Sequence, residues 1–185
     1  MPANRRPVAR QDKQDEIVRA AAALFTDVGY DETSMAQLSA SAGVTTNTVY
    51  WYFEDKDALL VAVLDLLLGE ALAEQAQQES LPWDEQVLWA VGRLQTFNRL
   101  VSVVHARAAA APGVAAWHEQ FHGLADELLT AGFRKAGVAE VDLAAATRIG
   151  TFVIEGLLTH PQDEAGSRAL ISLLATRFGP GAPAR

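Results

Sequence analysis

Apolar residues recur at three- and four-residue spacing through most of the chain, which is the pattern of helices with one buried face. The first such stripe begins at Ile17 and ends at Val28. No segment alternates like a strand, and no repeat of about 20–50 residues is found. The pattern predicts an all-α chain of about nine helices. After the first, we expect helices at 34–42, 46–53, 56–78, 84–104, 114–136, 141–159 and 164–178.

The segment 33–56, TSMAQLSASAGVTTNTVYWYFEDK, contains two short predicted helices joined at Gly43-Val44. Ser34, with Gln37 three residues later, forms a possible capping box, with Thr33 as the competing N-cap, and Thr45 is expected to cap the second helix. Their apolar positions can pack together, which fixes the angle of a helix-turn-helix. The second helix then begins with small polar side chains that suit base edges and phosphates. The segment therefore indicates DNA binding.

Charge and composition modify this picture only slightly. The chain of 185 residues is half hydrophobic and carries a formal net charge of −8. Its N-terminal arm is nevertheless basic, and fifteen of the 23 acidic residues follow residue 56. A local basic arm can bind phosphate while the remainder stays acidic. The arm contributes Arg5, Arg6, Arg10 and Lys13.

Several classes of protein are disfavoured by what the sequence lacks. There is no cysteine, which excludes disulfides and cysteine nucleophiles. The N-terminus has no apolar segment of a secretory signal, and no apolar run is long enough to span a bilayer. We therefore expect a cytoplasmic protein without membrane association.

The order GYDETSMAQLSASAGVTTNTVYWYFEDKDALL resembles the N-terminal signature of the TetR family of transcriptional regulators. The likeness covers about residues 12–64 and includes a glycine-aromatic pair, a Thr-Ser pair, Ala-Gly-Val at the turn and a run of aromatic residues. It implies a ligand-responsive repressor that binds a palindromic operator as a homodimer. It also implies an N-terminal arm and DNA-binding domain over 1–56 and a ligand-binding and dimerisation domain over 57–178. The tail 179–185 is expected to be disordered.

The resemblance also assigns roles to individual side chains, although any one of them can instead cap a helix or pack in the core. Gln37 is the candidate on the first short helix for contacting a base, because the methyl side chain of Ala36 cannot form a hydrogen bond to one. Tyr52 stands where relatives often have histidine. The positions that usually touch phosphates are Thr33, Thr45, Tyr50 and Lys56. The positions expected to face bases are Thr46, Asn47, Thr48 and Trp51.

The resemblance places dimerisation on the last two helices, over 141–178. Their apolar residues serve either a four-helix interface or the core of the single chain. These residues are Leu143, Ala146, Ile149, Phe152, Val153, Leu157, Leu170, Ile171 and Leu174.

A ligand cavity is expected among the middle helices, with aromatic walls and a few polar groups. Few charges occur there, which favours an apolar or aromatic small-molecule effector. No cofactor is expected. The candidate lining residues are Trp89, Phe97, Asn98, His105, Trp117, His118, Phe121, His122 and Phe133.

The stretch His118-Glu119-Gln120-Phe121-His122 matches the zinc-peptidase motif H-E-x-x-H. Two imidazoles four residues apart on a helix share one face and can hold a metal. The sequence after it lacks the third-ligand extension that many zinc peptidases carry. The alternatives are a metallopeptidase, a non-catalytic metal site completed by His105 or by a partner subunit, or two histidines on a helix surface. We favour the last, and predict neither a metal site nor catalytic residues.

Overall fold

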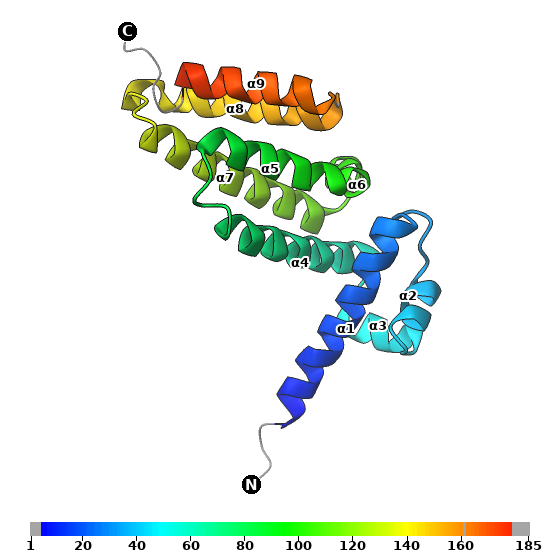
Figure 1. The fold of residues 1–185 in the computed structure, drawn as a ribbon. Coiled ribbons are helices and arrows are strands. Elements are labelled where there is room, and N and C mark those ends of the chain that lie inside the picture. Colours follow the sequence, from blue (N-terminus) through cyan, green and yellow to red (C-terminus); the bar gives the residue numbers. More distant parts are fainter. Residues whose placement is uncertain (1–4, 161, 179–185) are drawn as a thin grey trace. The chain divides into compact units, whose positions relative to one another are not determined.

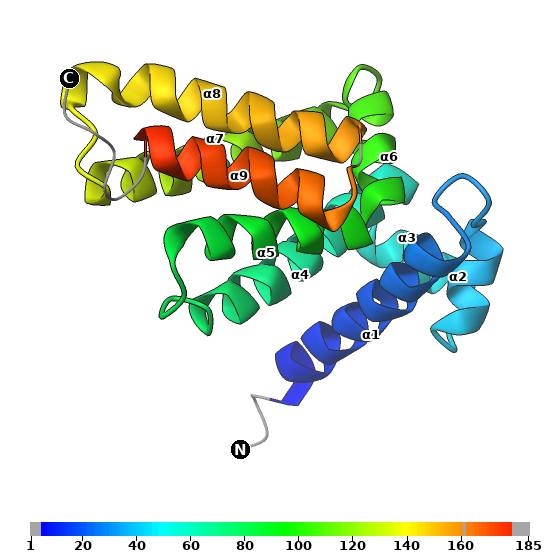
Figure 2. The ribbon, with the colours of Figure 1, turned by 45° about the horizontal axis from the view of Figure 1, so that its top comes forward.

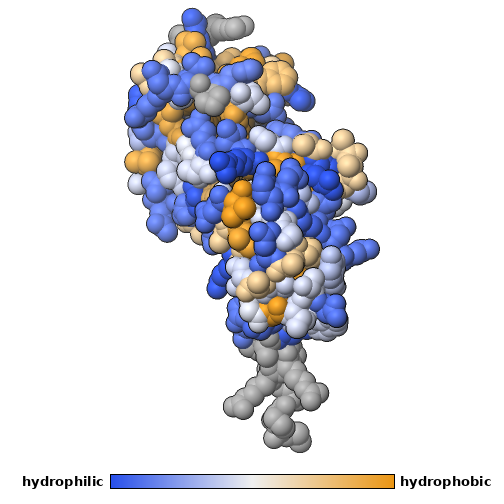
Figure 3. Space-filling view, turned by 90° about the vertical axis from the view of Figure 1, so that its right-hand side faces the viewer, coloured by the Kyte–Doolittle hydropathy of each residue, from blue (hydrophilic) through white to orange (hydrophobic). Residues whose placement is uncertain are grey.

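The computed structural model describes residues 5–160 and 162–178. Within them the chain forms nine α-helices and no strand, which confirms the predicted all-α class (Figure 1). No described helix is both long and apolar enough to cross a bilayer. On the face drawn in Figure 3, hydrophobic residues form separate groups among hydrophilic ones. The helices are α1 (Arg5–Asp27), α2 (Met35–Ser41), α3 (Thr46–Tyr52), α4 (Lys56–Ala76), α5 (Trp83–Thr96), α6 (Asn98–Ala108), α7 (Pro112–Lys135), α8 (Glu140–Thr159) and α9 (Glu164–Phe178).

The backbone packs as two compact units, each formed from two stretches of sequence. The first unit comprises residues up to 72 together with 99–118, and the second comprises 73–98 together with 119 onward. These packing units do not coincide with the predicted boundary at residue 56, which divides the chain by function and stays a prediction. The predicted disordered tail 179–185 lies outside the described residues.

Two predicted helix boundaries differ from the structure. The stretch 84–104, expected as one helix, is two helices, α5 and α6, separated at Phe97. There the N–H of Phe97 bonds to the carbonyl oxygen of Leu94 at 3.0 Å, and the hydroxyl of Thr96 bonds to that of Arg93 at 2.6 Å. Both bonds reach back to the carbonyl oxygen three residues earlier, and such bonds tighten the last turn of a helix and end it. From Arg5 onward the predicted N-terminal arm is part of α1, so this helix begins earlier than the apolar stripe at Ile17 indicated.

In the first unit, α1, α2 and α3 pack around a small apolar centre (Figure 1). Phe25 on α1 and Val49 on α3 are completely buried, and Leu38 on α2 is 1% exposed. Gly43 has φ of +64° in the turn between α2 and α3, a conformation that residues with a Cβ seldom adopt. The turn predicted at this glycine is therefore confirmed, and with it the helix-turn-helix geometry of α2 and α3.

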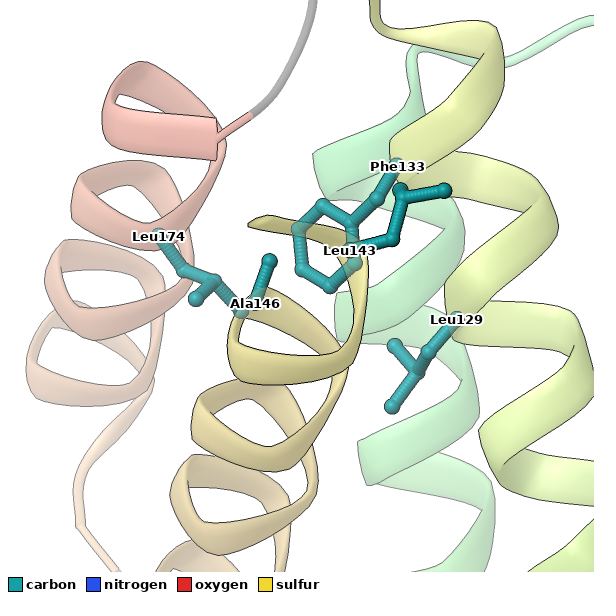
Figure 4. Close-up of a cluster of buried hydrophobic side chains, with 5 residues drawn as sticks. All are labelled: Leu129, Phe133, Leu143, Ala146 and Leu174. Atoms are coloured by element: carbon teal, nitrogen blue, oxygen red, sulfur yellow. The ribbon is translucent and has the colours of Figure 1, made fainter. Parts of the chain in front are cut away.

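The second unit has its core where α5, α7, α8 and α9 meet (Figures 2 and 4). Phe133 is fully buried and projects from α7 toward Leu143 and Ala146 of α8. Leu174 closes the cluster from α9. Leucine and phenylalanine on facing sides thus join three consecutive helices, α7, α8 and α9, and this packing holds α8 beside α9.

Gly132 on α7 is expected to tolerate no side chain, because a Cβ there would lie 2.2 Å from Nε1 of Trp83. The ring of Trp83 packs on Phe133 at a centroid distance of 5.0 Å, so it cannot turn away freely. We expect Gly132→Ala to lower the free energy of unfolding by about 1–2 kcal/mol, as overpacking does. Gly123 on the same helix has nothing within 4 Å of such a Cβ. Gly123→Ala is the control and should raise the free energy of unfolding by up to about 1 kcal/mol. Urea denaturation of both variants measures this, and equal effects would refute the steric argument.

Candidate nucleic-acid interface

The beginning of α2 is fixed by a complete capping box. Ser34 is the N-cap, and its hydroxyl oxygen accepts the N–H of Gln37 at 3.2 Å. The side-chain oxygen of Gln37 accepts the N–H of Ser34 in return at 2.8 Å. Of the two N-caps that the sequence allowed, Ser34 is thus the one used. Gln37 itself is exposed, but its amide oxygen is engaged in the cap, which leaves its NH₂ group as the part that can reach outward.

Helix α3 begins at the polar cap that the sequence indicated. The hydroxyl oxygen of Thr45 accepts the N–H of Thr48 at 3.2 Å, and the two hydroxyl oxygens lie 2.9 Å apart. Thr46 instead faces α2, where its hydroxyl lies 3.0 Å from that of Ser39. The first turn of α3 therefore has one hydroxyl that joins the two helices and two that serve the cap.

The outer side of α3 carries large side chains that the core does not use. Tyr50 is 50% exposed and Trp51 is 60% exposed, whereas Val49 between them and the cap is completely buried. Asn47 is exposed in the first turn. Tyr52 is half-buried, with its ring edge-on to Trp51 at 4.7 Å. An exposed amide and two exposed aromatic rings on a seven-residue helix form a surface suited to contacts with a partner.

A positive charge from α1 lies beside this surface. The guanidinium carbon of Arg10 is 4.5 Å from the centroid of the Trp51 ring, a cation–π contact. Lys13, one turn later, is ion-paired with Glu16. Of the basic residues in the predicted arm, the side chains of Arg5 and Arg6 lie outside the described part of the structure. Arg10 is thus the one for which a position beside α3 is established.

The side chains of Thr33 and Lys56 are more buried than their predicted phosphate contacts require. Thr33 is 1% exposed, and its hydroxyl donates to the carbonyl oxygen of Gly29 at 2.6 Å. The ammonium of Lys56 donates to the carbonyl oxygen of Thr33 at 2.8 Å and lies 4.1 Å from the ring centroid of Tyr30. Burial lowers the pKa of Lys56 from its usual value. Both residues stabilise the turn between α1 and α2, and the burial of Thr33 argues against its predicted phosphate contact.

The same region holds a network that the sequence analysis missed. The carboxylate of Asp57, at the beginning of α4, accepts the hydroxyl of Tyr30 at 2.6 Å and Nε of Arg107 at 2.9 Å. Nη2 of Arg107 reaches its second oxygen. The guanidinium of Arg107, together with the Tyr30 hydroxyl, holds the pKa of Asp57 below its usual range despite partial burial. Burial and the bond to Asp57 raise the pKa of Tyr30. No local signal marks this pairing, because Arg107 is fifty residues away on α6.

The candidate ligand residues do not all have the same surroundings. In the first unit, the rings of His105 and His118 meet edge to face at 4.9 Å, and Nε1 of Trp117 donates to Asp65 at 2.8 Å. In the second unit, Phe97 lies under the guanidinium of Arg93 at 4.7 Å. Phe133 is a core residue with no exposed surface, so the prediction that it lines a cavity is disfavoured. For the remaining candidates, Trp89, Asn98, Phe121 and His122, a role as ligand contacts stays a prediction.

Apart from Val153, which is half-buried against the core, the residues predicted for dimerisation divide into two groups. One group is buried in the core of the chain itself: Leu143, Ala146, Leu157, Ile171 and Leu174. The other is exposed, with Ile149 at 43%, Phe152 at 62% and Leu170 at 43%. Leu173, which the sequence analysis did not name, is 57% exposed on α9. The helix pair α8 and α9 therefore has two apolar faces. One face packs in the core of the chain, and the other lies on the surface.

Comparisons with known proteins give one consistent result. Residues 17–63 match the family model described as bacterial regulatory proteins, tetR family. An uncharacterized HTH-type transcriptional regulator, YhgD of Bacillus subtilis, is 32% identical over 90 residues, covering 48% of this chain and 47% of the relative. An HTH-type transcriptional regulator of Saccharopolyspora erythraea is 29% identical over 169 residues, covering 86% of this chain and 67% of that protein. The first of these matches thus spans about half of the relative's length.

The fold itself also has solved counterparts. A putative transcriptional regulator from Saccharomonospora viridis, solved in complex with choline, superposes with a TM-score of 0.71 at 15% identity. The likeness covers 90% of this chain and 95% of the other. At this identity it supports the arrangement of helices alone. None of these relatives is described as a peptidase, and the metallopeptidase alternative has no support.

Proposed function

Because residues 17–63 match the tetR family of bacterial regulatory proteins, we propose that this chain is a TetR-family transcriptional regulator that binds an operator with α3 as its recognition helix. The observation that carries this is the exposed outer side of α3, where Asn47, Tyr50 and Trp51 have no role in the core. A short helix after a turn enters the major groove with its N-terminal residues toward the bases. The guanidinium of Arg10 beside Trp51 supplies positive charge for the adjacent phosphates.

The proposal includes a homodimer that uses the exposed sides of α8 and α9. These helices run side by side in Figure 2, and the contacts between them confirm that they are neighbours. Phe152, Ile149, Leu170 and Leu173 expose apolar surface there. Two subunits related by a two-fold axis place two recognition helices on successive major grooves, about 34–36 Å apart. This geometry requires a palindromic operator.

A small-molecule effector is proposed to act through the first unit. Arg107 on α6 is bonded to Asp57 in the first turn of α4, four residues after Phe53, the C-cap of α3. A ligand that displaces α6 therefore acts on the support of the recognition helix. Such a ligand lowers operator affinity if it binds better to the displaced state. The choline bound to the Saccharomonospora relative is consistent with a ligand-responsive regulator; for this chain, the aromatic candidates favour an apolar or aromatic effector.

The test of DNA binding compares Asn47→Ala with Arg10→Ala. Asn47 can bond to base edges, so its loss should weaken operator binding by about 1–2 kcal/mol and relax preference at one base pair. Arg10 is a phosphate candidate, so its loss should weaken operator and scrambled DNA alike and reduce the salt slope by about one. Fluorescence anisotropy across a salt series measures both. If neither variant changes binding to either DNA, α3 is not the recognition helix.

A further inference from the structure

Four side chains of the first unit form a row that leads from its core to its surface. Phe53 is buried, and its ring centroid lies 6.5 Å from that of Tyr52. Tyr52 is half-buried and meets the ring of Trp51 at an interplanar angle of 90°, with the centroids 4.7 Å apart. The guanidinium carbon of Arg10, on α1, lies 4.5 Å from the centroid of the Trp51 ring. The row therefore joins the end of α3 to the beginning of α1.

The ring of Trp51 is supported from the side of the core, although most of it is exposed. Trp51 is 60% exposed, so burial alone does not explain its orientation. The edge-on contact with Tyr52 is a favoured arrangement of two aromatic rings. Indole is also the side-chain ring that attracts cations most strongly. Trp51 thus offers Arg10 a ring whose orientation is already fixed.

Arg10 is exposed on α1, ahead of Ile17, where the buried stripe of that helix begins. Lys13, the next basic residue of the helix, is ion-paired with Glu16. Among the described residues, no carboxylate forms an ion pair with Arg10. An arginine side chain loses much conformational entropy when it is fixed in one position. The contact with Trp51 offsets part of this cost before DNA is bound.

Stacking on a ring leaves the hydrogen-bond donors of an arginine available. A guanidinium meets an aromatic ring with its flat face, whereas its five N–H donors lie in its own plane. Arg10 can therefore stay over Trp51 and donate to the oxygens of a phosphate, which match its fork geometry. A lysine has a single ammonium, which would have to serve both the ring and the phosphate. The arrangement thus requires arginine and not only a positive charge.

We propose that Trp51 is a positioning residue whose ring holds the guanidinium of Arg10 beside α3, where Arg10 contacts a phosphate of bound DNA. This inference deepens the proposed function and rests on it, because it needs α3 to lie at the DNA. It gives Trp51 a role different from the base contact that the resemblance implies, since the ring face covered by a guanidinium is not open to a base. Tyr52 supports the same ring from the side of the core.

The experiment is a double-mutant cycle on DNA binding by the full chain, with a fluorescein-labelled duplex of mixed sequence as the probe. Phosphate contacts do not depend on sequence, so the operator is not needed. Trp51→Ala should weaken binding at low salt about two- to five-fold, the value of an exposed cation–π contact. In the Arg10→Ala background, Trp51→Ala should have no further effect, because the side chain that it positions is already absent.

The matched control is Tyr50→Ala, which truncates the neighbouring ring of α3. Tyr50 is 50% exposed, and the ring contacts of the described residues place Arg10 over Trp51 and not over Tyr50. The effect of Tyr50→Ala should therefore be the same in the wild type and in the Arg10→Ala background. Trp51→Phe keeps a weaker ring for the cation and should lose less affinity than Trp51→Ala. Arg10→Lys keeps the charge and should still weaken binding at least about two-fold.

Three results would overturn the proposal. One is an effect of Trp51→Ala that is equally large in both backgrounds, which would make Trp51 a DNA contact in its own right. Another is Trp51→Ala or Arg10→Lys protein that binds the duplex as the wild type does. The third is a wild-type chain that does not bind this duplex at low salt. Circular dichroism checks the folding of each variant, and Arg10→Lys, at an exposed position, decides the question even if Trp51→Ala does not fold.

Failure of this inference is distinguishable from failure of the proposed function. Asn47→Ala on the operator tests α3 as the recognition helix and does not depend on the contact between Arg10 and Trp51. If Asn47→Ala relaxes preference at one base pair while Trp51→Ala and Arg10→Ala act independently, α3 remains the recognition helix and only the positioning role is lost.

Discussion

Replacing Phe152 with glutamate is expected to convert the proposed homodimer into monomers and to lower affinity for the proposed operator about 10²–10⁴-fold. Phe152 is 62% exposed on α8, where Leu170 and Leu173 of α9 are exposed as well. A carboxylate in an apolar two-fold interface meets its own copy, so both burial of charge and repulsion oppose association. Without the proposed dimer, each proposed recognition helix would bind its half-site alone, and the gain from joining two binding sites would be lost.

The control for this variant is Leu128→Glu, which replaces another exposed apolar side chain of the second unit with a carboxylate. Leu128 is 44% exposed but lies on α7, outside the proposed interface. Light scattering should show a dimer for wild type and Leu128→Glu and a monomer for Phe152→Glu. A dimeric Phe152→Glu protein with unchanged operator affinity would place the interface on another surface.

Removing the carboxylate of Asp57 is expected to have the second largest effect. In Asp57→Ala the hydroxyl of Tyr30 and the guanidinium of Arg107 lose their acceptor at once. Hydrogen bonds to charged groups contribute more than neutral ones, and partial exposure reduces their value, so we expect a loss of about 2–3 kcal/mol in the free energy of unfolding. Asp55→Ala is the comparison in the same segment. It removes one bond to the N–H of Ala58 and should cost about 1 kcal/mol.

The contribution of Asp57 should also depend on pH. Its pKa is lower in the folded chain than in the unfolded one, chiefly because of Arg107. The stabilisation is therefore complete above the unfolded pKa, about 4, and is lost as the pH falls through the lower, folded value. The difference in unfolding free energy between wild type and Asp57→Ala should be constant near neutral pH and shrink below about pH 4. A difference that does not change with acid would mean that the charge of Asp57 contributes nothing.

The features that the sequence determined are those built from neighbouring residues. Such features depend on contacts within about one helical turn, so the residue types in the sequence predict them. They include the caps at Ser34 and Thr45, the turn at Gly43 and the apolar face of α1. The break at Phe97 was missed for a related reason, since the apolar spacing continues through it and only the last-turn hydrogen bonds end α5. The helical class and the segment that forms α2 and α3 could thus be predicted.

What only the tertiary structure decided is which distant side chains meet. Arg107 and Asp57 are fifty residues apart, and nothing in either neighbourhood encodes their pairing. The same holds for His105 beside His118, which the sequence offered as one possibility among several. Periodicity marks a face as apolar but cannot say whether the chain itself or a second copy covers it, and packing alone separated buried Leu143 from exposed Phe152. A helix is specified by local bonds, whereas a site depends on how several helices pack, and that depends on the shape of every side chain between them.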